Sequence, residues 1–218
     1  MPNVCQKFIL VLVLALSLTW TTTAQQPQEN IQRSANASKV LLYVDESPVT
    51  QAQLNAKRSI VIEQQRTLVQ QVEVSQDEID SAALTLAVRE KMLLNEAKAQ
   101  GIEFADGEIS QRVRSMQEDV TASGDEEAKA AFRWAIAQNG LTDAEFASDP
   151  RVIAAYRVMF TLAEIRSRIV ANQVGSADTV TSEEAVEKFI QNRGAKLRIA
   201  DPSISTAART VQLRLRLE

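Results

Sequence analysis

The sequence predicts a mainly α-helical fold with one or two short β-strands near the ends of the chain. The 218 residues include only six glycines and five prolines, the two residue types that most weaken a helix interior. Four Ser or Thr residues are followed three positions later by Glu or Gln, the spacing of a capping box, and each stands before a segment of helical periodicity. Short apolar runs with strand character lie near residues 40–44 and beyond residue 194.

The four capping boxes predict four helix starts. They begin at Thr50, Ser75, Thr142 and Thr181. We expect helices over residues 50–71 and 75–100, a short helix after Thr142, and a helix over residues 181–193. The first of these is long, polar on one side and rich in Gln.

Three further helices follow from apolar stripes and from the residues that bound them. Residues 106–122 carry one clean stripe, and Gly124 ends that helix. Acidic residues are stabilising at the positive N-terminal end of a helix dipole, so residues 125–127 predict the start of a helix. We expect this helix to end at Asn139-Gly140. Pro150 precedes a long helix over residues 151–174.

Residues 88–113, VREKMLLNEAKAQGIEFADGEISQRV, predict a helical hairpin. Gly101 suits the left-handed backbone that ends a helix, and Asp106 is a favourable N-cap for the next one. We expect Ile102 and Phe104 to be buried at the turn. The hairpin would hold the neighbouring helices in place.

Three apolar runs predict strands. Residues 40–44, VLLYV, are β-branched and apolar, and the DESP sequence after them predicts a turn. Residues 196–200 alternate like a half-exposed strand, and residues 202–210 are typical of a loop. VQLRLRLE at residues 211–218 alternates strictly and predicts a strand with one buried face.

The N-terminus predicts export. Residues 1–24 place Lys7 before an apolar run and end in small residues, as in a cleaved signal peptide, with an uncleaved anchor as the alternative. Residues 25–39 are polar and predict a flexible leader. We therefore expect a helical domain over residues 40–193 and a strand and loop extension over residues 194–218.

Composition excludes several classes of function. After residue 24 the chain has 23 basic and 28 acidic residues, and this net charge of −5 argues against nucleic-acid binding. The chain lacks His, its one Cys is Cys5, and its glycines stand alone, so we expect no catalytic residues, no metal site and no cofactor. The acidic pairs at helix starts, such as Glu183-Glu184, have an ordinary role at the helix dipole.

Binding of apolar segments is the remaining function, and aromatic side chains are its candidate residues. Five of the eight aromatic residues after position 24 fall between residues 132 and 160. Flexible Met and large aromatic side chains suit a surface that accepts varied apolar segments. Trp134 lies off the apolar face of its helix and Met159 lies at the edge of a stripe, so they are the first candidates. The others are either core or contact residues: Phe132, Phe146, Tyr156 and Phe160.

The order of these segments resembles a known family. A short strand, DESPVTQAQL, the AKAQGIEF turn with its acidic restart, AQNGLTDAEF and a long helix together resemble the N-terminal chaperone domain of SurA-type periplasmic folding factors, which the substrate-binding arms of trigger factor also resemble. The resemblance covers residues 40–193. In that family a segment similar to TSEEAVEKFIQNR leads into a parvulin prolyl isomerase domain, and VQLRLRLE is similar to the place where that domain would begin, without its histidine.

The resemblance implies an ATP-independent holdase in the periplasm, or one tethered by an uncleaved anchor. Its partners would be unfolded or nascent exported polypeptides, with outer-membrane protein precursors as one candidate class, and neither nucleic acid nor a small-molecule substrate. The oligomeric state stays open. Two alternatives stay open as well: a scaffold protein with one dedicated partner, and a residual or split foldase whose isomerase activity is supplied elsewhere.

Overall fold

The computed structural model describes residues 37–67, 74–173 and 181–215. The predicted signal peptide and nearly all of the predicted leader therefore lie outside the described residues. The chain divides into two compact units. Unit 1 contains residues 103–161, and unit 2 contains residues 24–102 and 162–218; residues 1–23, which are grouped with unit 1, are among those not described.

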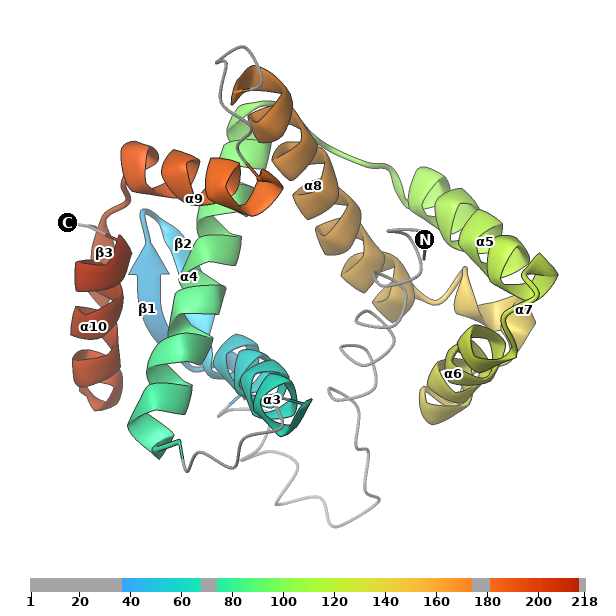
Figure 1. The fold of residues 1–218 in the computed structure, drawn as a ribbon, viewed down its shortest axis with the longest axis horizontal. Helices are drawn as coiled ribbons and strands as arrows, with labels where there is room; N and C mark the ends of the chain where they lie inside the picture. The colour runs from blue at the N-terminus through green and yellow to red at the C-terminus, as the bar shows by residue number, and fades with distance from the viewer. Residues whose placement is uncertain (1–36, 68–73, 174–180, 216–218) are drawn as a thin grey trace. The chain divides into compact units, whose positions relative to one another are not determined.

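A small antiparallel sheet joins the two ends of unit 2. Its strands are β1 (Val40–Val44), β2 (Ser47–Thr50) and β3 (Leu197–Ile199), in the order β2-β1-β3 (Figure 1). β1 is the central strand, and its apolar residues Leu41, Leu42 and Val44 are fully buried. The strands predicted at residues 40–44 and 196–200 thus correspond to β1 and β3, which pair with each other.

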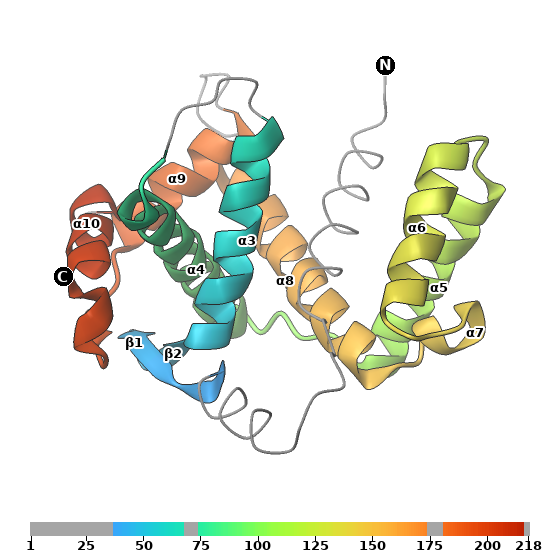
Figure 2. The same cartoon turned by 90° about the horizontal axis from the view of Figure 1, so that it is seen from below.

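The helices of unit 2 pack around α4 (Gln76–Ala99). Figures 1 and 2 show α4 between α3 (Gln51–Thr67) and α10 (Ser205–Leu215). α9 (Ser182–Arg193) also contacts α4. The short 3₁₀ helix η1 (Pro202–Ile204) leads into α10. Apolar residues on several sides of α4 are buried, as its position between neighbouring helices requires.

Unit 1 is helical. It consists of α5 (Asp106–Ala122), α6 (Glu126–Gln138), the single-turn α7 (Asp143–Phe146) and the first half of α8 (Pro150–Gln173). Apolar residues from all four helices form one core. In sequence order the buried members are Ile109, Val113, Val120, Phe132, Ala135, Ile136, Phe146, Ala147, Val152 and Tyr156.

The predicted fold class is confirmed. The capping boxes at Ser75, Thr142 and Thr181 form as predicted, and Thr50 exchanges the same pair of contacts with Gln53. α5 has the predicted bounds. None of the described helices combines the length and apolar character that crossing a bilayer requires.

The prediction of a strand at VQLRLRLE is wrong for its described part. Residues 211–215 are the last turn and a half of α10, in which Val211 and Leu215 are buried four positions apart, while Leu213 between them is 82% exposed. Val211 and Leu215 thus lie on one face of the helix, and α10 packs on α4. The prediction of a loop over residues 202–210 is also wrong, because η1 and the first part of α10 occupy that stretch.

The hairpin predicted for residues 88–113 is divided between the two units. Gly101 has the expected positive φ of 67°, but the unit boundary falls directly after Ile102. The N-cap of α5 is Ala105, which offers no side-chain cap, and Asp106 is the first helical residue. Asp106 instead forms an ion pair with Arg157 of α8, within unit 1. Ile102 is buried, whereas Phe104 is only partly buried.

Strand β2 was not predicted. Residues 45 and 46 form the turn of a β1–β2 hairpin, with Asp45 at a φ of 55°. Pro48 lies within β2, and proline in a run argues against a strand in the interior of a sheet. Because β2 is an edge strand, Pro48 is tolerated there.

Candidate functional site

All six residues predicted to bind apolar segments lie in unit 1. Three of them, Phe132, Phe146 and Tyr156, are buried in its core. Met159 and Phe160 are partly buried and pack against the same core. Trp134 is 50% exposed. The structure thus separates the six residues into a buried group and a group that reaches the surface.

Four aromatic rings form a continuous series from the core to the surface, which we call the aromatic series. It runs from Phe132 through Phe146 and Tyr156 to Phe160, and successive ring centroids are 5.4, 6.1 and 5.9 Å apart. The first two contacts are edge-to-face, at 77° and 87° between ring planes, a geometry that aromatic quadrupoles favour. Burial raises the pKa of the Tyr156 phenol, so this ring stays neutral at physiological pH.

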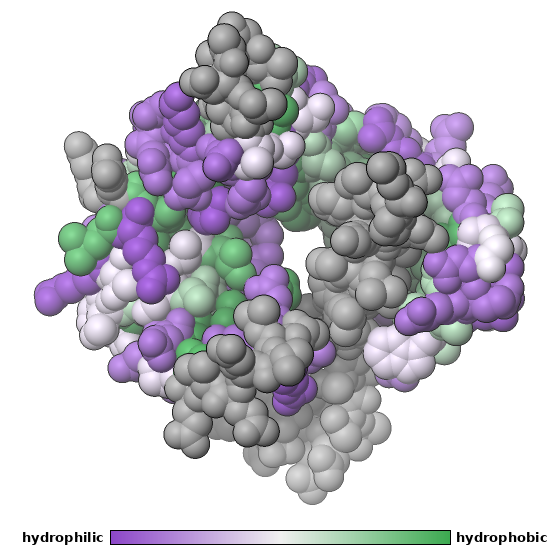
Figure 3. Space-filling view, in the orientation of Figure 1, coloured by the Kyte–Doolittle hydropathy of each residue, from purple (hydrophilic) through white to green (hydrophobic). Residues whose placement is uncertain are grey.

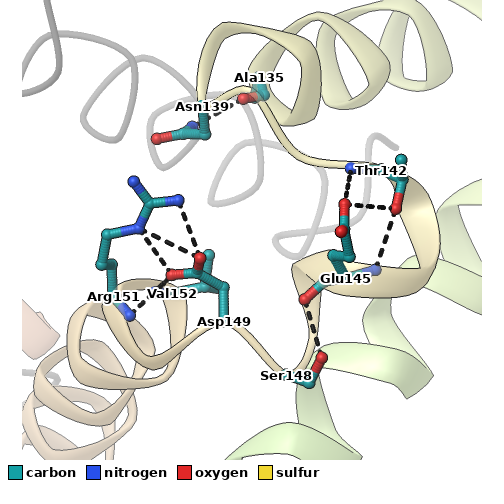
Figure 4. Close-up of polar contacts among 8 residues, drawn as sticks. All are labelled: Ala135, Asn139, Thr142, Glu145, Ser148, Asp149, Arg151 and Val152. Carbon is teal, nitrogen blue, oxygen red and sulfur yellow. Dashed lines mark hydrogen bonds and ion pairs between the residues drawn. The ribbon is translucent and has the colours of Figure 1, made fainter. Parts of the chain in front are cut away.

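The position of Phe146 is fixed by the caps of α7. Thr142 Oγ1 accepts a hydrogen bond from the backbone N–H of Glu145 (3.3 Å), and the Glu145 carboxylate accepts one from the backbone N–H of Thr142 (2.9 Å; Figure 4). Ser148 Oγ donates to the Glu145 carbonyl at the other end (3.0 Å). These bonds hold a helix of a single turn, which propensity alone would not stabilise. The hydrogen bonds from Thr142 also hold the pKa of Glu145 below its usual value.

Asp149 fixes the start of α8 and so the position of Tyr156. Its Oδ1 accepts from the backbone N–H of Arg151 (2.8 Å) and, more weakly, from that of Val152 (3.4 Å; Figure 4). The Arg151 guanidinium donates to both carboxylate oxygens. The charged hydrogen bonds from this side chain are the main reason why the pKa of Asp149 falls to about 2. Pro150 at the first helical position loses no hydrogen bond there.

Partly buried apolar side chains surround the core of unit 1, and we call them the apolar rim. The rim consists of Phe104, Met116, Ala131, Leu141, Ile153, Met159 and Phe160. It continues the aromatic series to the surface at Phe160. The surface over α5, α6 and α7 is otherwise mainly hydrophilic in the view of Figure 3. The rim therefore offers apolar contacts beside a mainly hydrophilic surface.

Five of the seven rim residues and a neighbouring cation were not predicted as site residues. Phe104 and Met116 were assigned to a turn and to a helix stripe, and Arg112 was not singled out. In the structure the Arg112 guanidinium lies over the rings of Phe104 and Phe160, with its carbon 4.5 and 5.4 Å from the two centroids. The Glu108–Arg112 spacing in α5 signals an ion pair, but nothing in the sequence brings Phe160 close to this pair.

Trp134 lies apart from the core residues of α6. Phe132, Ala135 and Ile136 face the core, while Trp134 and its sequence neighbour Arg133 are exposed. A tryptophan buries a large apolar area when it is covered, so an exposed one is an informative exception on a surface. This placement agrees with the prediction from the helix periodicity. The role of Trp134 in binding stays a prediction.

The polar clusters of unit 2 have a structural role. Arg193 at the end of α9 donates to Glu96 (3.1 Å) and Asp45 (3.3 Å), and Asp45 also accepts from the backbone N–H of Lys196 (3.1 Å). Together these contacts connect α9, α4 and the β1–β2 turn, and an open depression lies beside them. Among the described residues no cluster of His, Cys, Asp or Glu could hold a metal ion.

Comparison with known proteins identifies the family. A family model described as the SurA-like N-terminal domain matches residues 3–159, well over half of the chain. The comparisons with curated proteins and with solved structures found no match. The family match agrees with the motifs of residues 40–159 and with the helical fold, and it supports a chaperone-like role in general. The chain thus belongs to the SurA-like N-terminal domain family of chaperone-type helical domains.

Proposed function

We propose that the protein is an ATP-independent holdase that binds unfolded polypeptides after export to the periplasm. The observation that supports this most is the aromatic series, which begins in the core of unit 1 and ends in the partly exposed rim. A rigid core beneath a rim of Phe and Met side chains can cover varied apolar segments, because such contacts are non-directional. The clients would be unfolded exported chains, including outer-membrane protein precursors.

The six predicted residues have two roles in this proposal. Trp134, Met159 and Phe160 contact the client, because their side chains reach the surface. Phe132, Phe146 and Tyr156 hold the rim in position from below. Phe104 joins the contact residues, since it is partly buried and lies beside Phe160 under the same guanidinium.

The mechanism is reversible shielding. The rim covers an exposed apolar segment of the client, and the acidic exterior of unit 1 keeps the complex soluble. A disordered client must be partly ordered when it binds, and this cost makes the affinity modest and release spontaneous.

The test is an aggregation assay with several unrelated unfolded proteins, carried out without nucleotide on the chain that begins after residue 24. The holdase proposal expects delayed light scattering for each of them at a few-fold molar excess. If the chain protects none, the proposal is wrong. Protection of one protein alone, together with a tight stoichiometric complex, would favour a dedicated partner.

A further inference from the structure

Arg112 covers two aromatic rings of the apolar rim. Its guanidinium carbon is 4.5 Å from the centroid of Phe104 and 5.4 Å from that of Phe160, both within the range of a cation–π contact. Its Nη2 lies 2.8 Å from Oε1 of Glu108, one turn earlier in α5. The arginine is thus held by two ring faces and one carboxylate, the chemistry that suits any guanidinium or ammonium group.

The two rings are held in place by contacts that do not involve Arg112. Phe160 packs on Tyr156 at the end of the aromatic series. The backbone at Phe104 is fixed because its carbonyl accepts a hydrogen bond from Arg157 Nε (3.3 Å), and Arg157 also pairs with Asp106. Both side chains also pack against the core of unit 1, so we expect the ring pair to persist when the Arg112 side chain moves away. Arg112 is 45% exposed along its side chain, so water is available to the guanidinium after it leaves.

Charge favours a cationic replacement. Residues 103–161 contain 11 acidic and 6 basic residues, a net charge of −5. The remaining residues after position 24 contain 17 of each kind, so unit 1 carries the entire net charge of the chain that begins after residue 24. A basic segment is attracted to such a surface, while an acidic one is repelled.

We propose that Phe104, Phe160 and Glu108 form a cation site that Arg112 fills in the free protein and that a Lys or Arg side chain of a client fills in the complex. The site selects apolar segments that carry a basic residue among their apolar neighbours. Arg112 competes with the basic side chain of the client for this site. A client that carries such a side chain displaces Arg112 and therefore binds the rim better than one that does not. This inference rests on the proposed function, since it names the class of segment that the rim accepts.

The experiment compares three fluorescent peptides that share one apolar segment and differ at one adjacent position, which is Arg, Gln or Glu. Their dissociation constants are measured for the unaltered chain, for Arg112→Ala and for Arg114→Ala. Arg114 is the matched control, because it is an exposed arginine of the same helix and lines a surface depression whose lining includes neither Phe104 nor Phe160. Both variants lose the same charge, so any difference between them reports the ring site.

The unaltered chain should prefer the Arg peptide to the Gln peptide, and the Gln peptide to the Glu peptide. Arg112→Ala should bind the Arg peptide roughly two- to fivefold tighter than Arg114→Ala does, the range expected for one exposed cation–π contact. The two variants should bind the Gln peptide equally. Adding Phe104→Leu to Arg112→Ala keeps an apolar side chain but removes the ring, and it should abolish the gain.

Four results would overturn the inference. If Arg112→Ala and Arg114→Ala change Arg-peptide affinity equally, only the general charge matters. If the gain survives Phe104→Leu, the ring does not hold the cation. If the Gln peptide binds while the Arg peptide shows no preference, the rim binds clients without a cation site and the holdase proposal stands. When none of the peptides binds any variant, the holdase proposal and this inference fail together.

Discussion

The ring of Phe146 stands edge-on to the ring of Phe132, with centroids 5.4 Å apart and planes at 77°. Phe146 belongs to a helix of one turn, and only 1% of its surface is exposed. The contact joins α7 to α6, and the next ring contact, with Tyr156, joins α7 to α8. Phe146 is therefore the residue through which the short helix is tied to both of its neighbours.

Replacing Phe146 with Ala should destabilise unit 1 strongly. Removal of a buried phenylalanine ring typically costs about 3–5 kcal/mol, because burial is lost and a cavity remains. Chemical denaturation followed by circular dichroism measures this loss. Phe189→Ala in α9 is the control, since Phe189 is partly exposed in unit 2 and should cost less. Equal losses for the two variants would contradict the central place of Phe146.

Replacing Trp134 with Ala should weaken client binding while the unfolding midpoint hardly moves. A substitution at an exposed position usually changes stability by no more than about 0.5 kcal/mol, whereas a large aromatic contact surface is lost to the client. Leu213→Ala is the matched control, because Leu213 is an exposed apolar residue outside unit 1. It should leave client affinity unchanged. A large fall in the midpoint for Trp134→Ala would show that the side chain is part of the fold.

Asp149 should make unit 1 sensitive to acid. Its pKa is about 2 in the folded protein, below the ordinary value of 3.8, chiefly because Arg151 donates hydrogen bonds to the carboxylate. In that interval the unfolded chain binds more protons than the folded one, so the free energy of unfolding falls as the pH drops from about 4 to about 2. Denaturation midpoints measured at a series of pH values report this slope.

Two substitutions separate the charge of Asp149 from its capping role. Asn caps a helix as well as Asp does, so Asp149→Asn should retain the cap and flatten the acid slope. Asp149→Ala should in addition lose about 1 kcal/mol at neutral pH, a typical cost of removing a cap. An unchanged slope in Asp149→Asn would mean that other carboxylates cause the acid sensitivity.

Gly101 and Gly107 should respond to alanine in opposite directions. Gly101 has a φ of 67°, which costs an L-residue roughly 1–2 kcal/mol, so Gly101→Ala should lower the free energy of unfolding by about that amount. Gly107 lies in the first turn of α5 without a positive φ, and a methyl group added there would meet no atom within 4 Å. Gly107→Ala should therefore stabilise by roughly 0.4–1 kcal/mol, because the unfolded chain loses freedom. Thermal unfolding of the two variants measures both changes in stability. A stabilised Gly101→Ala variant would contradict the argument that the turn at residue 101 requires glycine.

Local signals predicted most of the helices. The starts of α4, α7 and α9 depend on capping side chains next to those helices, whereas the bounds of α5 followed from its apolar stripe and from Gly124. The errors have a different origin. VQLRLRLE satisfies both a strand and a helix pattern, and only contact with α4 selects the helix. β2 was not predicted because it contains Pro48, and a sequence does not show which strand forms the edge of a sheet, where proline is tolerated.

The site was predictable only in part, for a related reason. The periodicity of α6 showed that Trp134 lies off the core face, and the structure agrees. The assembly of Phe104, Arg112 and Phe160 depends on α5 and α8 meeting in space, and these residues are separated by up to 56 positions along the chain. A single sequence carries no signal for contacts between residues so far apart.

The unit boundaries also imply an order in which the parts of the protein fold. The described part of unit 1, residues 103–161, is one continuous stretch of chain, whereas unit 2 is made of two segments that flank it. A chain that emerges with its N-terminus first, during synthesis or export, has residues 103–161 complete once residue 161 has emerged, while β1 waits for β3, which pairs with it from more than 150 residues further along. Contacts between such distant residues form late, because the intervening loop must first be closed. The aromatic series can thus be in place before the sheet that joins the two ends of unit 2.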